Sequence, residues 1–217
     1  MKTLHEEIAK YKEEFAHKAP EEVKKIMDAE TQKLIKANIS KNALKVGDQM
    51  SNFILPNAAN KLISLDEILK GNEYAVISFY RGAWCPYCNL ELRALQRINE
   101  DLVALKAKLV AISPQTPDVS LSLKEKQELA FEVLSDLHNE VAKAYGLVFS
   151  LPLVLRAIYA SFGHDIPGSN NDNSYELPMP ATYVINKDKK IIFSFVNEDY
   201  RKRCEPQDIL LAIRENS

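Results

Sequence analysis

The sequence predicts an α/β protein in which helices cover both faces of a mixed central sheet. Apolar, β-rich runs at 75–80, 109–113 and 131–135 alternate with helical patterns. This alternation is typical of parallel strands joined by crossover helices. Two further strands are expected at 181–186 and 190–196, on either side of a short polar turn. Such a hairpin adds antiparallel pairing to the sheet.

The chain begins with a predicted helical hairpin at 3–18 and 21–37, interrupted by Ala19-Pro20. One face of the first helix is apolar and carries Leu4, Ile8, Tyr11 and Phe15 at helical spacing. We expect residues 1–43 to form a helical N-terminal extension and residues 44–217 to form the main domain. The apolar face requires a cover, so the hairpin either packs on the main domain or forms the contact of a homodimer.

Shorter helices are expected along the rest of the chain. One opens at Pro117, and others span 139–145, 153–162 and 206–213. The segment 163–178 is rich in Gly, Asn, Asp, Ser and Pro. This composition predicts a long surface loop, and loops of that length are often functional.

Composition limits the function classes. With 28 basic and 30 acidic residues, the net charge of −2 gives no electrostatic reason to expect nucleic acid or an anionic membrane as a partner. The first twenty residues lack the apolar core of a secretory signal, and no apolar run is long enough to span a membrane. Three cysteines do not make a secreted disulfide framework. We therefore expect a soluble, cytoplasmic protein.

The chain is organised around the stretch 75–92, which joins a buried strand to a long helix and carries a CxxC motif. One face of that helix is apolar, with Leu92, Leu95, Ile98, Leu102 and Leu105 at steps of three and four. Gly82 permits a tight turn before the motif, and Pro86 suits the first position of a helix. The cysteines thus lie at the carboxyl end of a central strand, where reactive sites of open α/β sheets are found.

This position predicts different roles for the two sulfurs. The unpaired N–H groups of a first helical turn favour an anion, so a sulfur at that place is shifted toward thiolate. Cys85 is expected to be the more exposed and more acidic sulfur. Cys88 lies about one turn further along the helix and can attack a mixed disulfide or a sulfenic acid formed on Cys85.

Three interpretations of the pair compete. A redox-active pair is favoured because strand, turn, CxxC and helix agree. Half of a zinc site is the second, but only the distant Cys204 and scattered histidines are available as further ligands. Inert, buried structural cysteines are the third. On the favoured interpretation no metal and no cofactor is expected.

Three segments carry a resemblance to a known family. They are VGDQMSNFILPNA at 46–58, FYRGAWCPYC at 79–88 and LPMPATYVINKDKKI at 177–191. Together they resemble peroxiredoxin-like proteins of the alkyl hydroperoxide reductase C/thiol-specific antioxidant (AhpC/TSA) type, within the thioredoxin superfamily. The resemblance implies a thioredoxin-like fold and reduction of hydrogen peroxide or organic hydroperoxides. It also implies Cys85 as peroxidatic cysteine, Cys88 as resolving cysteine, and thioredoxin or a similar dithiol as reductant.

The sequence departs from the family pattern at two positions. The usual threonine three residues before the reactive cysteine is Gly82, and the usual arginine before the facing strand is Pro180. Arg81 either supplies the missing positive charge or caps a strand end. Pro180 occupies the place of the cis-proline of thioredoxins, and Trp84 is also thioredoxin-like. We expect Trp84, Tyr87 and Pro180 to contact the substrate, with Tyr87 shaping access.

Two other functions stay open. One is a thioredoxin-like protein disulfide oxidoreductase that acts without peroxide. The other is a binding module whose partner contact changes with the oxidation state of the pair. Cys204 is either an alternative resolving thiol or an isolated cysteine, and His164 is expected to be an ordinary surface histidine.

Overall fold

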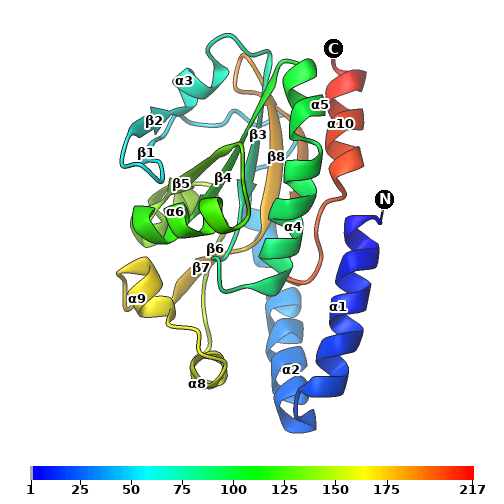
Figure 1. The fold of residues 1–217 in the computed structure, drawn as a ribbon, viewed down its shortest axis with the longest axis vertical. Coiled ribbons are helices and arrows are strands. Elements are labelled where there is room, and N and C mark those ends of the chain that lie inside the picture. Colours follow the sequence, from blue (N-terminus) through cyan, green and yellow to red (C-terminus); the bar gives the residue numbers. More distant parts are fainter. Residues whose placement is uncertain (1) are drawn as a thin grey trace.

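The computed structural model describes residues 2–217, and its centre is a five-stranded sheet with the strand order β5-β4-β3-β8-β9 (Figure 1). The strands are β3 (Tyr74–Phe79), β4 (Ala107–Ser113), β5 (Glu132–Ser135), β8 (Ala181–Asn186) and β9 (Ile191–Val196). β3, β4 and β5 are parallel, whereas β8 runs antiparallel to both β3 and β9. The predicted mixed sheet is confirmed.

Two apolar clusters, one on each face, hold this sheet between helices. One face packs against α1 (Leu4–Lys18), α4 (Pro86–Arg97), α5 (Asn99–Ala104), α6 (Pro117–Lys126) and α10 (Pro206–Glu215). The other face packs against the shorter α3 (Leu65–Leu69) and α7 (Glu140–Ala144). β3 is buried along its whole length because its alternate side chains enter both clusters.

Smaller elements complete the fold. β1 (Ile54–Pro56) pairs with β2 (Leu62–Ser64), and β6 (Val148–Ser150) pairs with β7 (Glu176–Pro178). α8 (Leu153–Ser161) and α9 (Ile166–Asn170) lie between β6 and β7, and the short 3-10 helices are Ile39–Asn42 and Leu137–Asn139. Within the described part of the chain, every helix is too short or too polar to cross a lipid bilayer.

The N-terminal helices pack on the rest of the same chain. Leu4 and Ile8 of α1 are buried in the cluster that includes α4. Ile26 and Met27 of α2 (Glu21–Ala37) pack against the cluster that contains α8. Figure 1 shows this helical hairpin beside α4 and below the sheet. The apolar face of the hairpin is thus covered within one chain, while a homodimer and a domain division at residues 43 and 44 stay predictions.

Two sequence expectations were wrong. The helix expected over 86–105 is interrupted at Ile98, where φ −102° and ψ 2° leave helical geometry and separate α4 from α5. The segment 163–178 is not an irregular loop, because it contains α9 and β7. Its polar residues serve as caps: Asp165 accepts a hydrogen bond from the backbone N–H of Gly168 at 2.9 Å and starts α9.

Candidate active site

The two cysteines of the CxxC motif lie at the start of α4, just after the turn that connects it to β3. β3 ends at Phe79, and the Cys85 N–H closes the following turn by donating to the Gly82 carbonyl at 3.1 Å. Cys85 caps the N-terminus of α4, and Pro86 occupies the first helical position. Both sulfurs are free thiols. The strand–turn–helix arrangement therefore matches the sequence prediction.

Both cysteines are buried, which corrects the expectation of an exposed Cys85. The exposed fractions are 1 % for Cys85 and 0 % for Cys88. The cover comes from segments far away in the sequence: α1, α2, the segment around α8, and Tyr200 after β9. Local spacing around the motif contains no information about such a cover.

A small pocket, with a cavity volume of about 60 Å³, opens beside Cys85. Four of the predicted site residues line it, namely Arg81, Trp84, Cys85 and Tyr87. Cys88 lies beneath them in the apolar core. Pro180 is buried next to the end of β3, since the following Ala181 pairs with Phe79, but it lies outside the lining of the pocket. No peptide bond among residues 2–217 is cis, so the bond before Pro180 is trans.

The guanidinium group of Arg81 is buried among aromatic rings. Its exposed fraction is 1 %, and its Nη2 donates to the Tyr159 hydroxyl at 2.8 Å. The guanidinium carbon lies 4.3 Å from the Tyr200 ring centroid and 5.0 Å from that of Trp84. In the part of the chain that the structure describes, no carboxylate forms an ion pair with Arg81. Its positive charge is therefore left for an anion in the pocket.

A second buried guanidinium, that of Arg203, faces the other sulfur. Its Nη2 donates to the Cys88 Sγ at 3.2 Å. Its Nε lies 2.8 Å from Glu91 Oε2 in an ion pair that is almost fully buried. Its Nη1 donates to the carbonyls of Tyr200 and Lys202. The sequence contained no signal for this residue, because Arg203 and Cys88 are 115 positions apart.

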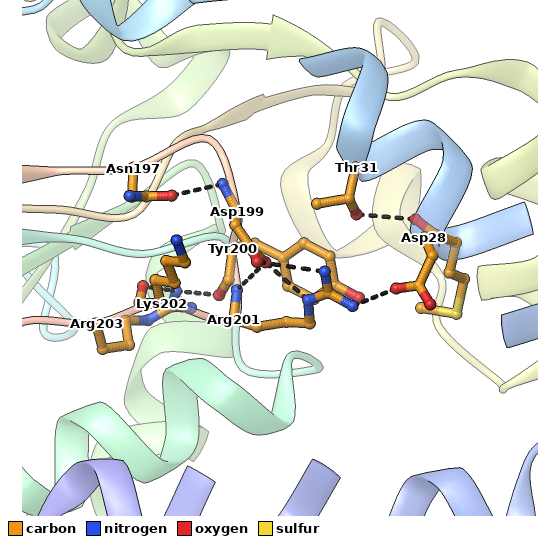
Figure 2. Close-up of polar contacts among 9 residues, drawn as sticks. Asp28, Thr31, Asn197, Asp199, Tyr200, Arg201, Lys202 and Arg203 are labelled. Carbon is orange, nitrogen blue, oxygen red and sulfur yellow. Dashed lines mark hydrogen bonds and ion pairs between the residues drawn. The ribbon is translucent and has the colours of Figure 1, made fainter. Parts of the chain in front are cut away.

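Arg203 lies at the end of the loop 197–203, between β9 and α10. Polar contacts hold this loop in place (Figure 2). The Asn197 side chain accepts from the Asp199 N–H at 2.9 Å, and Asp199 accepts from Arg201 Nε at 2.7 Å. Arg201 also pairs with Asp28 on α2. The loop is thus fixed both internally and against the N-terminal hairpin.

The electrostatic environment gives the two thiols different pKa values. Burial alone raises the pKa of Cys85, but the hydrogen bond from the Cys88 thiol and the charges of Arg81 and Arg203 lower that pKa to about 5. The pKa of Cys88 is held well above its usual value by burial and by its interaction with the Cys85 sulfur. At neutral pH the pair is a thiolate at Cys85 and a thiol at Cys88.

Glu91, on α4, is the acidic member of this buried group. Burial raises the pKa of its carboxyl to about 7, and the neighbouring Arg203 opposes that rise. Glu91 therefore changes charge close to neutral pH, next to the side of the site that holds Cys88. Sequence reasoning placed it on a helix but assigned it no role.

Gly82 allows the indole of Trp84 to lie directly over the turn. The backbone there has φ +150°, and a Cβ built on Gly82 would overlap the Trp84 indole nitrogen. The family's threonine therefore has no room at this position. The Trp84 Nε1 and the Arg81 Nε are both buried N–H groups without a hydrogen-bond acceptor among residues 2–217. Two donors on residues that line the pocket are thus available.

The remaining candidates are placed as follows. Tyr87 makes edge contacts with the rings of Tyr11 and Tyr200, at centroid distances of 5.2 and 5.5 Å. His164 is not an ordinary surface histidine: it lines the pocket, 5.5 Å from the Trp84 ring, and burial lowers its pKa. Cys204 is buried and donates to the Glu205 carbonyl at 3.3 Å. Between residues 2 and 217, no three His, Cys, Asp or Glu side chains gather in a way that could hold a metal ion.

Comparison with known proteins decides the family. The model of the AhpC/TSA family matches residues 46–194, more than half of the chain. The chain belongs to the AhpC/TSA family. This membership confirms the resemblance predicted from the sequence and makes the chain a peroxiredoxin-like member of the thioredoxin superfamily.

Similar proteins agree with that membership. A putative Bcp peroxiredoxin of Haemophilus influenzae is 34 % identical over 106 residues, which are 49 % of this chain and 67 % of that protein. One of Buchnera aphidicola, also 34 % identical, is matched over 65 % of its length and 48 % of this chain, so the chain spans about two thirds of these relatives. The thiol-disulfide oxidoreductase ResA of Bacillus thuringiensis is 22 % identical, over 75 % of this chain and 76 % of that protein.

Solved structures bear out the fold of this AhpC/TSA member. The crystal structure of peroxidoxin BcpB from Mycobacterium tuberculosis superimposes with a TM-score of 0.63 at 20 % sequence identity. The match covers 80 % of this chain and 99 % of that one. The expected thioredoxin-like fold is therefore confirmed, although identity at this level speaks for the fold alone.

Proposed function

We propose that this AhpC/TSA protein is a thiol peroxidase that uses Cys85 as its nucleophile and Cys88 as its resolving cysteine. The observation that carries the proposal is the pairing of an acidic Cys85 with the uncompensated charge of Arg81 at the floor of a pocket. A thiolate is the reactive form of cysteine, and buried donors that are in place before the reaction are what a peroxide cleavage needs.

The first step transfers one oxygen. The Cys85 thiolate attacks the terminal oxygen of a peroxide R–O–O–H, so that an S–O bond forms and the O–O bond breaks. The sulfur is oxidised to a sulfenic acid, and the departing RO⁻ takes a proton to become ROH. The N–H groups of Arg81 and Trp84 that lack an acceptor are suited to stabilise the charge developing on that oxygen.

The second step joins the two sulfurs. The Cys88 thiol gives up its proton and attacks the Cys85 sulfenic acid, which forms a disulfide and releases water. Arg203, which already donates to the Cys88 sulfur, stabilises the thiolate as it appears. An external dithiol, thioredoxin or a similar donor, then reduces the disulfide by thiol–disulfide exchange and becomes oxidised itself.

Oxidation kinetics test the proposal. Trp84 is the only tryptophan of the chain and lines the pocket, so its fluorescence can follow the oxidation of Cys85 in a stopped-flow instrument. We expect reaction with a peroxide at least about a hundredfold faster than for a free thiol at equal thiolate concentration, the scale of one preorganised donor. Equal rates for protein and free thiol would rule out the peroxidase function.

A disulfide oxidoreductase is the second candidate, because ResA is matched over three quarters of the chain and the motif is a CxxC. It predicts fast oxidation by a small disulfide and slow oxidation by peroxide, with Pro180→Ala impairing the disulfide reaction. A redox-regulated binding module predicts slow turnover with every donor and an affinity for its partner that changes on oxidation. A cytoplasmic location stays a prediction.

A further inference from the structure

The wall of the pocket above Cys85 is built partly by residues outside the segment that defines the family. Tyr11 and Phe15 of α1 and Met27 of α2 line the pocket together with Phe162, which follows α8. The family match begins only at residue 46. The hairpin therefore adds an apolar wall to a reactive centre that the rest of the chain supplies.

The aromatic side chains of this wall contact one another. The Phe15 ring lies 6.4 Å from that of Tyr11 and 6.4 Å from that of Phe162, in the second case edge to face. Tyr11 in turn meets Tyr87 edge to face at 5.2 Å. Burial raises the pKa of Tyr11, and the Cys85 charge makes a smaller contribution, so the Tyr11 hydroxyl stays protonated.

Polar residues also line this pocket. They include Cys85, Arg81 and Tyr159, whose hydroxyl accepts a hydrogen bond from Arg81. A pocket that combines a few polar groups with aromatic rings orients an amphipathic ligand. Hydrogen peroxide has no apolar part and cannot use such a wall.

We infer that the N-terminal hairpin is a specificity element that binds the organic group of a compact, apolar hydroperoxide and directs its O–O bond toward Cys85. This inference rests on the proposed peroxidase function. Burying the organic group against Phe15 and Met27 stabilises both the bound substrate and the transition state, so it raises the second-order rate constant. Oxygen transfer itself follows the chemistry given above, with R–OH as the organic product.

The test compares two peroxides. Cumene hydroperoxide serves as the probe with a compact aromatic group, and hydrogen peroxide serves as the probe without one. The measured quantity is the ratio of their second-order rate constants for oxidation of Cys85, followed by Trp84 fluorescence. In the parent protein we expect a ratio well above the ratio for a free thiol, by about tenfold or more.

Three variants locate the effect. Phe15→Ala removes a ring from the wall and should lower the ratio about tenfold, within the range for losing part of an apolar pocket. Phe15→Trp narrows the pocket and should lower the ratio by excluding the cumyl group. Because this variant adds a second tryptophan, its oxidation is followed by the loss of free thiol. Ile26→Ala is the matched control, because Ile26 packs the hairpin against the α8 cluster without lining the pocket. It should leave the ratio unchanged, because every side chain that lines the pocket is kept.

The outcomes separate this inference from the peroxidase function. If both Phe15 variants leave the ratio at the parent value, the hairpin is not a specificity element. If neither peroxide oxidises the parent faster than a free thiol, the peroxidase function itself is wrong. A fast parent with a ratio equal to that of a free thiol overturns the inference and leaves the peroxidase function standing.

Discussion

Among residues 2–217, Arg81 and Arg203 are both buried near the CxxC pair, and the charges of both lower the pKa of Cys85, but only Arg203 donates a hydrogen bond to Cys88. Arg81 is surrounded by the rings of Trp84, Tyr159 and Tyr200, and its one side-chain hydrogen bond goes to a neutral hydroxyl. Arg203, in contrast, pairs with the carboxylate of Glu91 and donates to two backbone carbonyls. The same cation is therefore held in two very different environments.

The difference explains how two cysteines one helical turn apart acquire different chemistry. A guanidinium held by aromatic faces keeps its full charge, and a buried charge is stabilised best by an opposite charge nearby. For Arg81 that partner is the Cys85 thiolate. Cys88 keeps its proton because of its burial and the neighbouring Cys85 sulfur. When ionised, Glu91 offsets part of the Arg203 charge that would otherwise lower the pKa of Cys88.

Removing the sulfurs one at a time gives the largest expected effect. Cys85→Ser should abolish oxidation by any peroxide. Cys88→Ser should still react once, but it should leave Cys85 as a sulfenic acid that excess peroxide oxidises further. A sulfenate-selective label followed by mass spectrometry checks both variants. A label on Cys88 in the first variant or on Cys204 in the second would contradict the assigned roles.

Replacing the caged arginine should have the next largest effect. Arg81→Met should slow oxidation by hydrogen peroxide by roughly ten- to a thousandfold, the scale of losing one preorganised donor. At a pH above the Cys85 pKa of both proteins, the same variant should react almost normally with a small neutral disulfide, where the thiolate itself is decisive. Arg156→Met is a matched control, because Arg156 also stacks on a tyrosine, Tyr175, at 4.3 Å but lies outside the pocket.

A pH profile separates the two contributions of Arg81. The parent rate should fall with acid around the Cys85 pKa of about 5 and be constant above it, because only the thiolate reacts. Without Arg81 that pKa rises, so the midpoint should move to higher pH. Any rate deficit that persists above the midpoints of both profiles, where Cys85 is thiolate in both proteins, measures the loss of the donor. Superimposable profiles would show that Arg81 does not act on Cys85.

Neutralising Glu91 should have the smallest effect, and it should accelerate a step, whereas the changes above slow one. Glu91→Gln leaves the charge of Arg203 without compensation, so the pKa of Cys88 should fall. Disulfide formation after one equivalent of peroxide should then become roughly tenfold faster at about pH 8. At about pH 5.5, below the Glu91 pKa of about 7, parent and variant should agree, since the carboxyl is protonated in the parent. Slower disulfide formation at both pH values would refute the restraining role of Glu91.

The sequence was informative where function depends on local order and silent where it depends on tertiary contacts. The buried run ending at Phe79, the turn at Gly82 and the helix from Pro86 follow from residue type and spacing, so the place of the CxxC motif could be predicted. Arg203 and Tyr200 come from a loop more than a hundred positions away. No local pattern links them to the motif.

The N-terminal hairpin also shows what a local sequence pattern can and cannot predict. Its apolar face, with Leu4 at one end and Phe15 at the other, was visible as a periodic pattern. Periodicity shows that such a face must be covered, but not by what. Leu4 enters the core beside α4, whereas Phe15 lines the pocket above Cys85. The burial of Cys85 is the consequence that sequence reasoning missed.

The close contact between Gly82 and Trp84 also restricts how this site can be altered, by design or by evolution. A threonine introduced alone at position 82 would collide with the indole, and a smaller residue introduced alone at position 84 would uncover one side of the Arg81 guanidinium. Each single change therefore disturbs the present packing without producing the arrangement that has a threonine. We expect a protein with only one of the two changes to be poorly active, so positions 82 and 84 should change together.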